Sequence, residues 1–268
     1  MTTRDTVVKI EAIERDAWLD MYDAAPAAVR GRLGLAQRRA DDGALLICRA
    51  FDHPQFDRLA HLGVAEPARG ETLDAALADF VAAGIGSFVV QVAPGAETLG
   101  QLCTARGLVV HSHRWAKFVR DAAPPPRFST SLAVREVRPD GARAFGAAIA
   151  AGFNLPAEFG EWVAALCGRP RWHCFAAYAG GTAVAAGSVY IDGACAWLGI
   201  GATIPAQRGL RAHLALLAVR IEAAIAAGCT LLTTETGIPH GGDVGPSFIN
   251  IQRAGFAAAY ARSSYYRP

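Results

Sequence analysis

The sequence contains an internal repeat, so its fold must accommodate two copies of the same run of elements. Residues Ala82–Gly95 (AAGIGSFVVQVAPG) resemble Ala226–Gly237 (AAGCTLLTTETG), and each segment follows an amphipathic helix that ends at Ala-Gly. Further along, residues 103–120 and 251–268 share a short helix, a glycine and a terminal strand. We therefore predict two halves that are copies of one fold.

A proline-rich segment separates the two halves. Asp121–Phe128 (DAAPPPRF) carries three prolines, which oppose both a helix and a central strand. We therefore place the domains at residues 1–123 and 124–268. A chain of 268 residues, of which 52% are hydrophobic, can fill the cores of two such domains.

The second half alternates strand and helix signals, which predicts a mixed sheet of the α/β class. Two turn dipeptides, Gly180-Gly181 and Asp192-Gly193, separate three apolar runs and predict a three-stranded meander. The expected order is a strand, two helices within residues 141–166, the meander, a long helix over 210–225, a strand over 230–235, a short helix over 247–254 and a final strand pair.

The composition excludes several classes of protein. With 26 basic and 24 acidic residues, the chain lacks the general positive field that captures nucleic acid. Its six cysteines include no C-x-x-C pair, so we interpret them as reduced core thiols. The N-terminal residues do not resemble a signal peptide, and Arg220 and Glu222 interrupt the longest alanine-rich run. We expect a soluble, cytoplasmic protein without a membrane or nucleic-acid partner.

A basic loop precedes the long helix of the second half. The segment Ile204–Leu217 (IPAQRGLRAHLALL) places Arg208 and Arg211 at the helix start, where backbone amides already create positive potential. An anion bound there, such as a diphosphate, would make both arginines favourable, and Gly209 would let the backbone approach it closely. The alternative is a solvent-facing basic turn at an ordinary helix start.

The loop and the order of elements resemble the GNAT superfamily of acetyl-CoA-dependent N-acetyltransferases, in its tandem-repeat form. The family pattern P-x-x-R-G-x-G-x-G/Q ahead of A-L-L is matched by Pro205, Arg208, Gly209 and residues 215–217, and its later Asn before Gly-Phe by Asn250. The resemblance implies that acetyl-CoA is the co-substrate, with its diphosphate at the loop. The coenzyme-binding residues that it implies are Ala202, Thr203, Ile204, Arg208, Gly209, Leu210, Arg211, Ala212, His213 and Asn250.

This sequence departs from the family pattern at two positions. Arg211 stands where the family prefers glycine, although its amide remains available and its side chain can reach a phosphate. Ile251 stands where many members carry a tyrosine that protonates the leaving thiolate, and isoleucine has no proton to donate. Tyr260 and Tyr190 are the alternative donors, and the reaction can also proceed without a dedicated acid.

The first half resembles a degenerate copy of the second. Its corresponding helix start, AEPARGETLDAAL, already carries Glu66, Glu71 and Asp74, which would repel a diphosphate. Nothing like Asn250 precedes Gly107. We expect the first half to serve as a packing partner or as one wall of the acceptor site.

Amine acylation calls for a base, because an amine with a pKa near ~10 is mostly protonated at neutral pH. Glu235 is the only acid on its strand, whose end borders the acceptor site in the family, and it is the candidate catalytic base. The alternative is a carboxylate bound to loop amides. For Asn250, which resembles the residue that binds the pantetheine arm, the alternative is an ordinary helix or turn asparagine.

Several other side chains are of types that bind metals, act as bases or line acceptor pockets. His111 and His113 share one strand face but lack a suitably spaced third metal ligand, so no metal is expected. His240 fits a base or a simple loop residue. Trp162 and Trp172 fit an acceptor pocket or the core, and the core is the commoner place for them.

The sequence therefore favours an acyl-CoA-dependent N-acyltransferase that moves an acetyl group directly to an amine. The alternative is a non-catalytic acyl-CoA-binding or regulatory protein. A small-molecule or peptide amine is the expected acceptor, and its identity and the acyl-chain preference stay open. An internal pseudo-dimer is compatible with a monomer.

Overall fold

The computed structural model describes residues 2–51, 53, 55–238 and 244–268. The first half contains α1 (Arg4–Ala24), α2 (Ala27–Leu33), β1 (Leu35–Ala40), β2 (Gly43–Cys48), β3 (Arg58–Ala60), α3 (Gly70–Ala82), β4 (Val89–Val92), α4 (Glu97–Ala105), β5 (Val109–Val110) and β6 (Arg114–Arg120). The second half contains β7 (Ala133–Glu136), α5 (Ala142–Phe153), α6 (Ala157–Ala164), β8 (Trp172–Ala179), β9 (Thr182–Asp192), β10 (Cys195–Thr203), α7 (Ala212–Ala226), β11 (Leu231–Ile238), α8 (Pro246–Arg253) and β12 (Ala257–Tyr266). Short 3₁₀ turns lie at Pro139–Gly141 and Pro205–Gln207.

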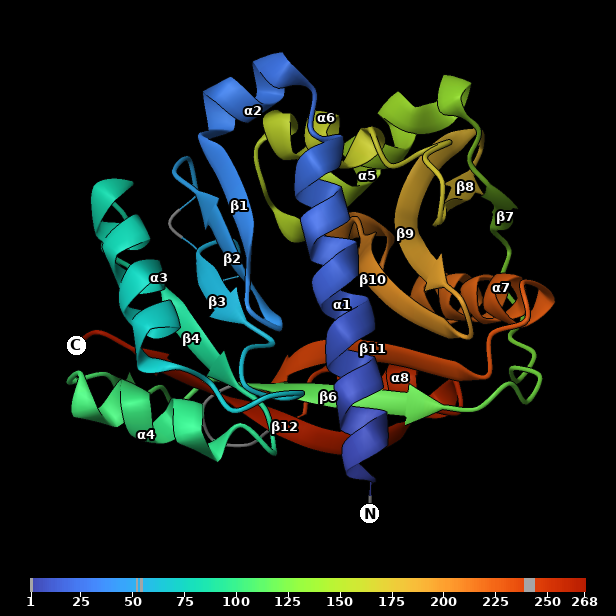
Figure 1. The fold of residues 1–268 in the computed structure, drawn as a ribbon. Coiled ribbons are helices and arrows are strands. Elements are labelled where there is room, and N and C mark those ends of the chain that lie inside the picture. The colour runs from blue at the N-terminus through green and yellow to red at the C-terminus, as the bar shows by residue number, and fades with distance from the viewer. Residues whose placement is uncertain (1, 52, 54, 239–243) are drawn as a thin grey trace.

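The two halves repeat the same order of elements, which confirms the mixed α/β class. Apart from β7 at the start of the second half and the two-residue β5 in the first, each has two helices, a three-stranded antiparallel meander, a helix, a strand parallel to the last meander strand, a second helix and a final strand. The strands form one sheet in the order β1-β2-β3-β4-β12-β6-β11-β10-β9-β8-β7 (Figure 1). The boundary predicted between residues 123 and 124 falls in the connection from β6 to β7 and stays a prediction.

The halves exchange their final strands. Strand β6 of the first half pairs with β11, and β12 of the second half pairs with β4. The two exchanged strands also pair with each other, along Ala257–Arg262 of β12. Side chains of β6 therefore lie beside β11 of the second half, and side chains of β12 lie beside β4 of the first half.

The expected final strand pair is wrong, because residues 257–266 form the single strand β12. Its first part pairs with β6, and its last residues pair with β4 and β5. A segment with partners along its whole length gains hydrogen bonds by staying extended, and AAAYARSSYY contains no glycine, proline, asparagine or aspartate that would fold it back. The glycine hairpins at 180–181 and 193 are confirmed by the pairing of β8, β9 and β10.

Helix α1 lies between the two meanders (Figure 1). Its buried side chains, including Ile13, Trp18 and Tyr22, join a core cluster that draws on α2, β1 and β2 of the first half and on α5, α6 and β8–β10 of the second. Separate clusters lie under α3 and under α7. Burial of apolar surface therefore holds the halves together as well as stabilising each one.

None of the helices in the described part of the chain combines the length and the apolar character needed to cross a bilayer.

Candidate active site

Strands β10 and β11 separate part of the way along their length. They pair in parallel from Cys195–Leu231 to Leu198–Thr234, and the pairing stops there, although β10 continues to Thr203 and β11 to Ile238. The pairing of β10 with β9 shifts register between Gly199 and Ala202, so β10 carries a bulge at the point of separation. The two strands therefore leave backbone groups facing an opening in the sheet.

A cavity of about 910 Å³ lies at this opening. It is lined by the diverging strand ends, the loop before α7, the start of α7, helix α8 and side chains from α1, α5 and α6. Residues from both halves therefore surround it. The expectation that the first half forms one wall of this site agrees with Trp18, Phe56 and Trp115 in the lining.

The loop before α7 has a backbone suited to concentrating amide groups at one point. Gly209 has φ +93°, and Arg211, the residue before the helix, has φ +60°, so both adopt the left-handed conformation. A left-handed Arg211 explains why the pattern favours glycine there. The helix start has no side-chain cap and no acid in its first turn, which leaves its first amides without intrahelical partners. A helix start with these features is suited to binding an anion.

Most of the residues expected to bind the coenzyme line the cavity. They are Ala202, Thr203, Arg208, Gly209, Arg211, Ala212, His213 and Asn250. Ile204 and Leu210 do not line it: the Ile204 amide donates to the Val184 carbonyl at 3.0 Å, and the Leu210 carbonyl accepts from Thr130 Oγ1 at 2.8 Å. The Arg211 side chain donates to Ser129 Oγ at 3.2 Å, so the segment after the proline run steadies this loop.

Polar side chains from α7 and α8 meet inside the cavity. Asn250 Nδ2 lies 3.4 Å from His213 Nδ1. Burial lowers the pKa of His213 to about 4, with a smaller contribution from Arg220, so this imidazole is neutral at pH 7. Arg220 is fully buried and donates to the Leu216, Ser188 and Gly199 carbonyls, which ties α7 to the strands beside the opening.

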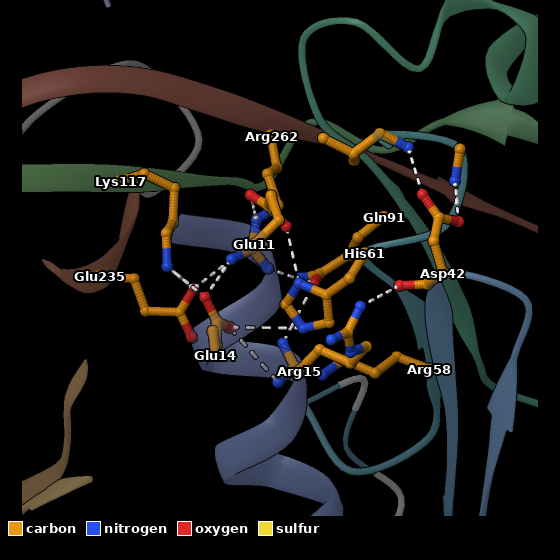
Figure 2. Close-up of polar contacts among 12 residues, drawn as sticks. Glu11, Glu14, Arg15, Asp42, Arg58, His61, Gln91, Lys117, Glu235 and Arg262 are labelled. Atoms are coloured by element: carbon orange, nitrogen blue, oxygen red, sulfur yellow. Dashed lines mark hydrogen bonds and ion pairs between the residues drawn. The ribbon is translucent and has the colours of Figure 1, made fainter. Parts of the chain in front are cut away.

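Glu235 lines the same cavity and belongs to a buried cluster of charges. Its Oε2 lies 3.3 Å from Arg262 Nη2 and 3.7 Å from Lys117 Nζ, and these cations come from the exchanged strands β12 and β6. Glu14 of α1 pairs with the same two cations (Figure 2). The alternative of a carboxylate bound to loop amides does not describe Glu235, because its partners are these side chains and Gln55 Nε2, at 3.4 Å.

The cluster shifts the pKa values of its carboxylates Glu235 and Glu14 in opposite directions. Burial raises the pKa of Glu235, and the charge of Glu14 raises it further, against the opposing effect of Lys117 and Arg262. Burial also acts to raise the pKa of Glu14, but Arg262 and Lys117 hold it well below its usual range. Glu14 is therefore the fixed anion of the cluster, and Glu235 is the carboxylate that can gain a proton more readily.

The corresponding helix start in the first half carries its own counter-charges. Helix α3 has Glu71 in its first turn, and Asp74 pairs with Arg106. Arg69, the counterpart of Arg208, pairs with Asp41. Neither Arg208 nor Arg211 forms an ion pair with any residue that the structure describes. Within the described part of the chain, the start of α7 therefore keeps uncompensated positive charge, whereas Arg69 and Asp74 at the start of α3 are paired.

The remaining candidates lie elsewhere. Trp162 and Trp172 are buried and donate to the Met21 carbonyl and to Asp20, so the core interpretation is confirmed for both. Tyr190 accepts from Arg171 and Tyr260 donates to Glu11, and neither lines the cavity.

The histidines His111 and His113 also do not contribute to the described lining of the cavity. His111 and His113 have ring centres 6.5 Å apart, and the described residues include no group of three or more side chains placed to hold a metal. His240 lies outside the described residues.

Sequence reasoning missed the residues around Glu235 and most of the aromatic lining. Glu11 and Glu14 interrupt the apolar stripe of α1, where Ile10 and Ile13 are buried, and acids on a buried helix face are a signal of a polar cluster. Arg220 interrupts the stripe of α7 in the same way. Lys117 and Arg262 carried no comparable signal, because their strands become neighbours only through the exchange.

Comparison with known proteins gives structural matches without sequence matches. No protein-family model matches the chain, and no curated protein matches it in sequence. A GCN5-related N-acetyltransferase from Kribbella flavida is similar over 97% of this chain and 96% of its own, with a TM-score of 0.63 and 15% identity. A GCN5-related N-acetyltransferase from Sphaerobacter thermophilus is similar over 84% of this chain and 80% of its own, with a TM-score of 0.60 and 14% identity.

A tandem GNAT protein from the clavulanic acid biosynthesis pathway is similar over 96% of this chain and 94% of its own, with a TM-score of 0.59 and 16% identity. At these identities the likeness concerns the fold. Together with the repeated order of elements, it confirms the predicted architecture: this chain has the tandem fold of the GCN5-related N-acetyltransferases.

Proposed function

We propose that this protein is an acyl-CoA-dependent N-acyltransferase that transfers an acetyl group from acetyl-CoA directly to an amine. The observation that carries the proposal is the cavity where β10 and β11 separate, because it joins an uncapped, basic helix start to a buried carboxylate of raised pKa. An anion site beside a base suits a reaction between a phosphate-bearing donor and a protonatable acceptor.

The residues present fit coenzyme A. The uncapped amides at the start of α7, with Arg208 and Arg211, would hold its diphosphate, and the unpaired edges of β10 and β11 together with Asn250 would hold its pantetheine arm. When bound, acetyl-CoA supplies an activated acyl group. Glu235 would take the proton that the amine must lose, and the bulged end of β10 would offer backbone amides to the carbonyl oxygen.

The test is release of free thiol from acetyl-CoA in the presence of a broad panel of amines, with the products identified by mass spectrometry. Transfer to an amine supports the proposal. Tight binding of acetyl-CoA without thiol release in the presence of any amine would instead favour a non-catalytic acyl-CoA-binding protein. That alternative is suggested by Ile251, which stands where many family members carry a tyrosine.

We expect one acetyl-CoA to bind per chain, in the second half. Gly209→Glu should weaken binding by about 100-fold or more, because two like charges about 4 Å apart repel by about 4 kcal/mol near a protein surface. A Cβ at residue 209 meets no atom within 4 Å, so the substitution causes no clash at Cβ, although the φ of +93° strains any side chain there. Isothermal titration with acetyl-CoA measures both the affinity and the stoichiometry.

Two control variants separate charge from backbone strain in this prediction. Gly209→Ala adds the same left-handed strain and a methyl group without the charge, so the additional loss of affinity in Gly209→Glu measures the effect of the charge. Gly70→Glu adds the charge at the start of α3 and should leave affinity nearly unchanged. Two binding sites per chain, or a loss of binding confined to Gly70→Glu, would contradict the assignment.

A further inference from the structure

The cavity lining includes six aromatic rings, which we call the aromatic wall. Its members are Trp18, Phe56, Trp115, Phe153, Phe159 and Trp197. They come from both halves. The ring centres of Trp18 and Trp197 are 5.9 Å apart, and those of Phe56 and Phe159 are 5.4 Å apart. Most are deeply buried, whereas Phe153 is 45% exposed. Phe153 and the partly exposed Trp115 are therefore the rings most open to a ligand, and the four buried rings form an apolar backing.

The charged residues of the cavity are not shared evenly between the wall and the coenzyme side. Its four arginines, Arg208, Arg211, Arg220 and Arg253, belong to the loop before α7, to α7 and to α8. Among the described residues that line the cavity, Glu235 is the one carboxylate. Arg58, whose guanidinium lies 4.4 Å from the Trp18 ring centre, is fully buried and donates to Gln91. The described lining of the cavity therefore has one acid, Glu235, and its arginines belong to α7, the loop before it and α8.

This arrangement selects among amines by their chemistry. A carboxylate or phosphate on the acceptor would face the wall without a cation, and a second ammonium would find no second carboxylate. The hydroxyl groups of an amino sugar that face the rings would lose water without gaining hydrogen bonds, and those that reach Gln55 or Thr236 would recover part of that loss. An aromatic body, by contrast, gains from stacking and burial, and its single ammonium has Glu235 as a partner.

We propose that the acceptor is a primary monoamine carried on an aromatic or similarly flat apolar body. This inference rests on the proposed function, because it assigns the acceptor part of the same cavity. The aromatic wall binds the body of the amine, and Glu235 receives the ammonium group and then its proton.

The first experiment compares 2-phenylethylamine with glucosamine, spermidine and glutamate as acceptors for acetyl-CoA. We expect kcat/KM for 2-phenylethylamine to exceed that of each polar amine by about 100-fold, which corresponds to about 2.7 kcal/mol of discrimination. A second readout does not need turnover: titration of 2-phenylethylamine should change the tryptophan fluorescence in a saturable way, since Trp18, Trp115 and Trp197 line the cavity.

The two readouts distinguish failure of this inference from failure of the proposed function. Transfer that is faster to a polar amine would overturn the inference and leave the acyltransferase intact. Saturable binding of 2-phenylethylamine without transfer to any amine would support the aromatic site and overturn the acyltransferase. Failure of 2-phenylethylamine to bind would overturn the inference.

A pair of variants tests the wall itself. Phe153→Ala removes the exposed rim ring and should raise KM for 2-phenylethylamine by about tenfold, while the Kd for acetyl-CoA and the KM for methylamine stay within about twofold. Val81→Ala is the matched control, because Val81 is 61% exposed on α3 and lies outside the cavity. Trp115→Leu should act like Phe153→Ala. Equal effects on both amines, or no effect from either wall variant, would contradict the assignment.

Discussion

Glu235→Gln is expected to lower kcat for amine acetylation at pH 7 by about 100-fold or more, since a positioned general base contributes 10²–10⁴-fold. Glutamine keeps the shape of the side chain but cannot take a proton. The Kd for acetyl-CoA should stay within about twofold, because the base acts on the amine. Steady-state kinetics of thiol release and isothermal titration with acetyl-CoA measure the two quantities separately.

The pH dependence of the same variant gives an independent check. Because the folded pKa of Glu235 is raised, its base form appears at a higher pH than for an ordinary carboxyl, and the wild-type rate should rise with pH through that raised pKa. In Glu235→Gln this limb should disappear, and the rate should partly recover as the pH approaches the pKa of the amine, near ~10. A variant with wild-type turnover and an unchanged profile would remove Glu235 from the mechanism.

Glu14→Gln is expected to reduce the free energy of unfolding at pH 7 by about 3–5 kcal/mol. Glu14 is fully buried and pairs with Lys117 and Arg262, and it lies 3.8 Å from Arg58. The variant leaves three buried cations, from three different strands, with less negative charge to compensate them. Urea unfolding followed by circular dichroism measures the loss.

Two comparisons make this prediction specific. Glu161→Gln removes a carboxylate whose partner is Arg32 at the surface, where both side chains are about half exposed, and it should cost less than about 1 kcal/mol. Glu235→Gln should also destabilise much less than Glu14→Gln, because the fold disfavours the ionised form of Glu235 and favours that of Glu14. Equal losses from Glu14→Gln and Glu161→Gln would contradict the structural role of the cluster.

The sign of the pH effect on stability follows from the lowered pKa of Glu14. Its contribution is present above the unfolded pKa, near ~4.5, and is lost as the pH falls through the folded value. Wild-type stability should therefore decrease below about pH 4.5. The difference between wild type and Glu14→Gln should shrink in the same range.

The repeat, the helices and the meander were predictable from the sequence because they depend on local patterns. Leu214, Leu217 and Ile221 recur at helical spacing, and glycine dipeptides mark the hairpins whatever the rest of the chain does. The loop at Arg208–Arg211 was readable for the same reason, since charge and glycine at a helix start act over a few residues. The proposed coenzyme side of the candidate site is therefore mostly local in sequence.

The acceptor side and the surroundings of Glu235 depend on the tertiary structure. The sequence alone identified Glu235 as an acid at a strand end, but its partners Lys117 and Arg262 are 118 and 27 residues away and reach it through the exchanged strands. Trp18 and Trp115 look like core residues in a linear pattern and become cavity lining only where α1 and β6 meet the second half. Local periodicity determines which elements form, whereas charge compensation and ring packing are non-local, so only the folded chain decides which carboxylate is held ionised and which one has the raised pKa.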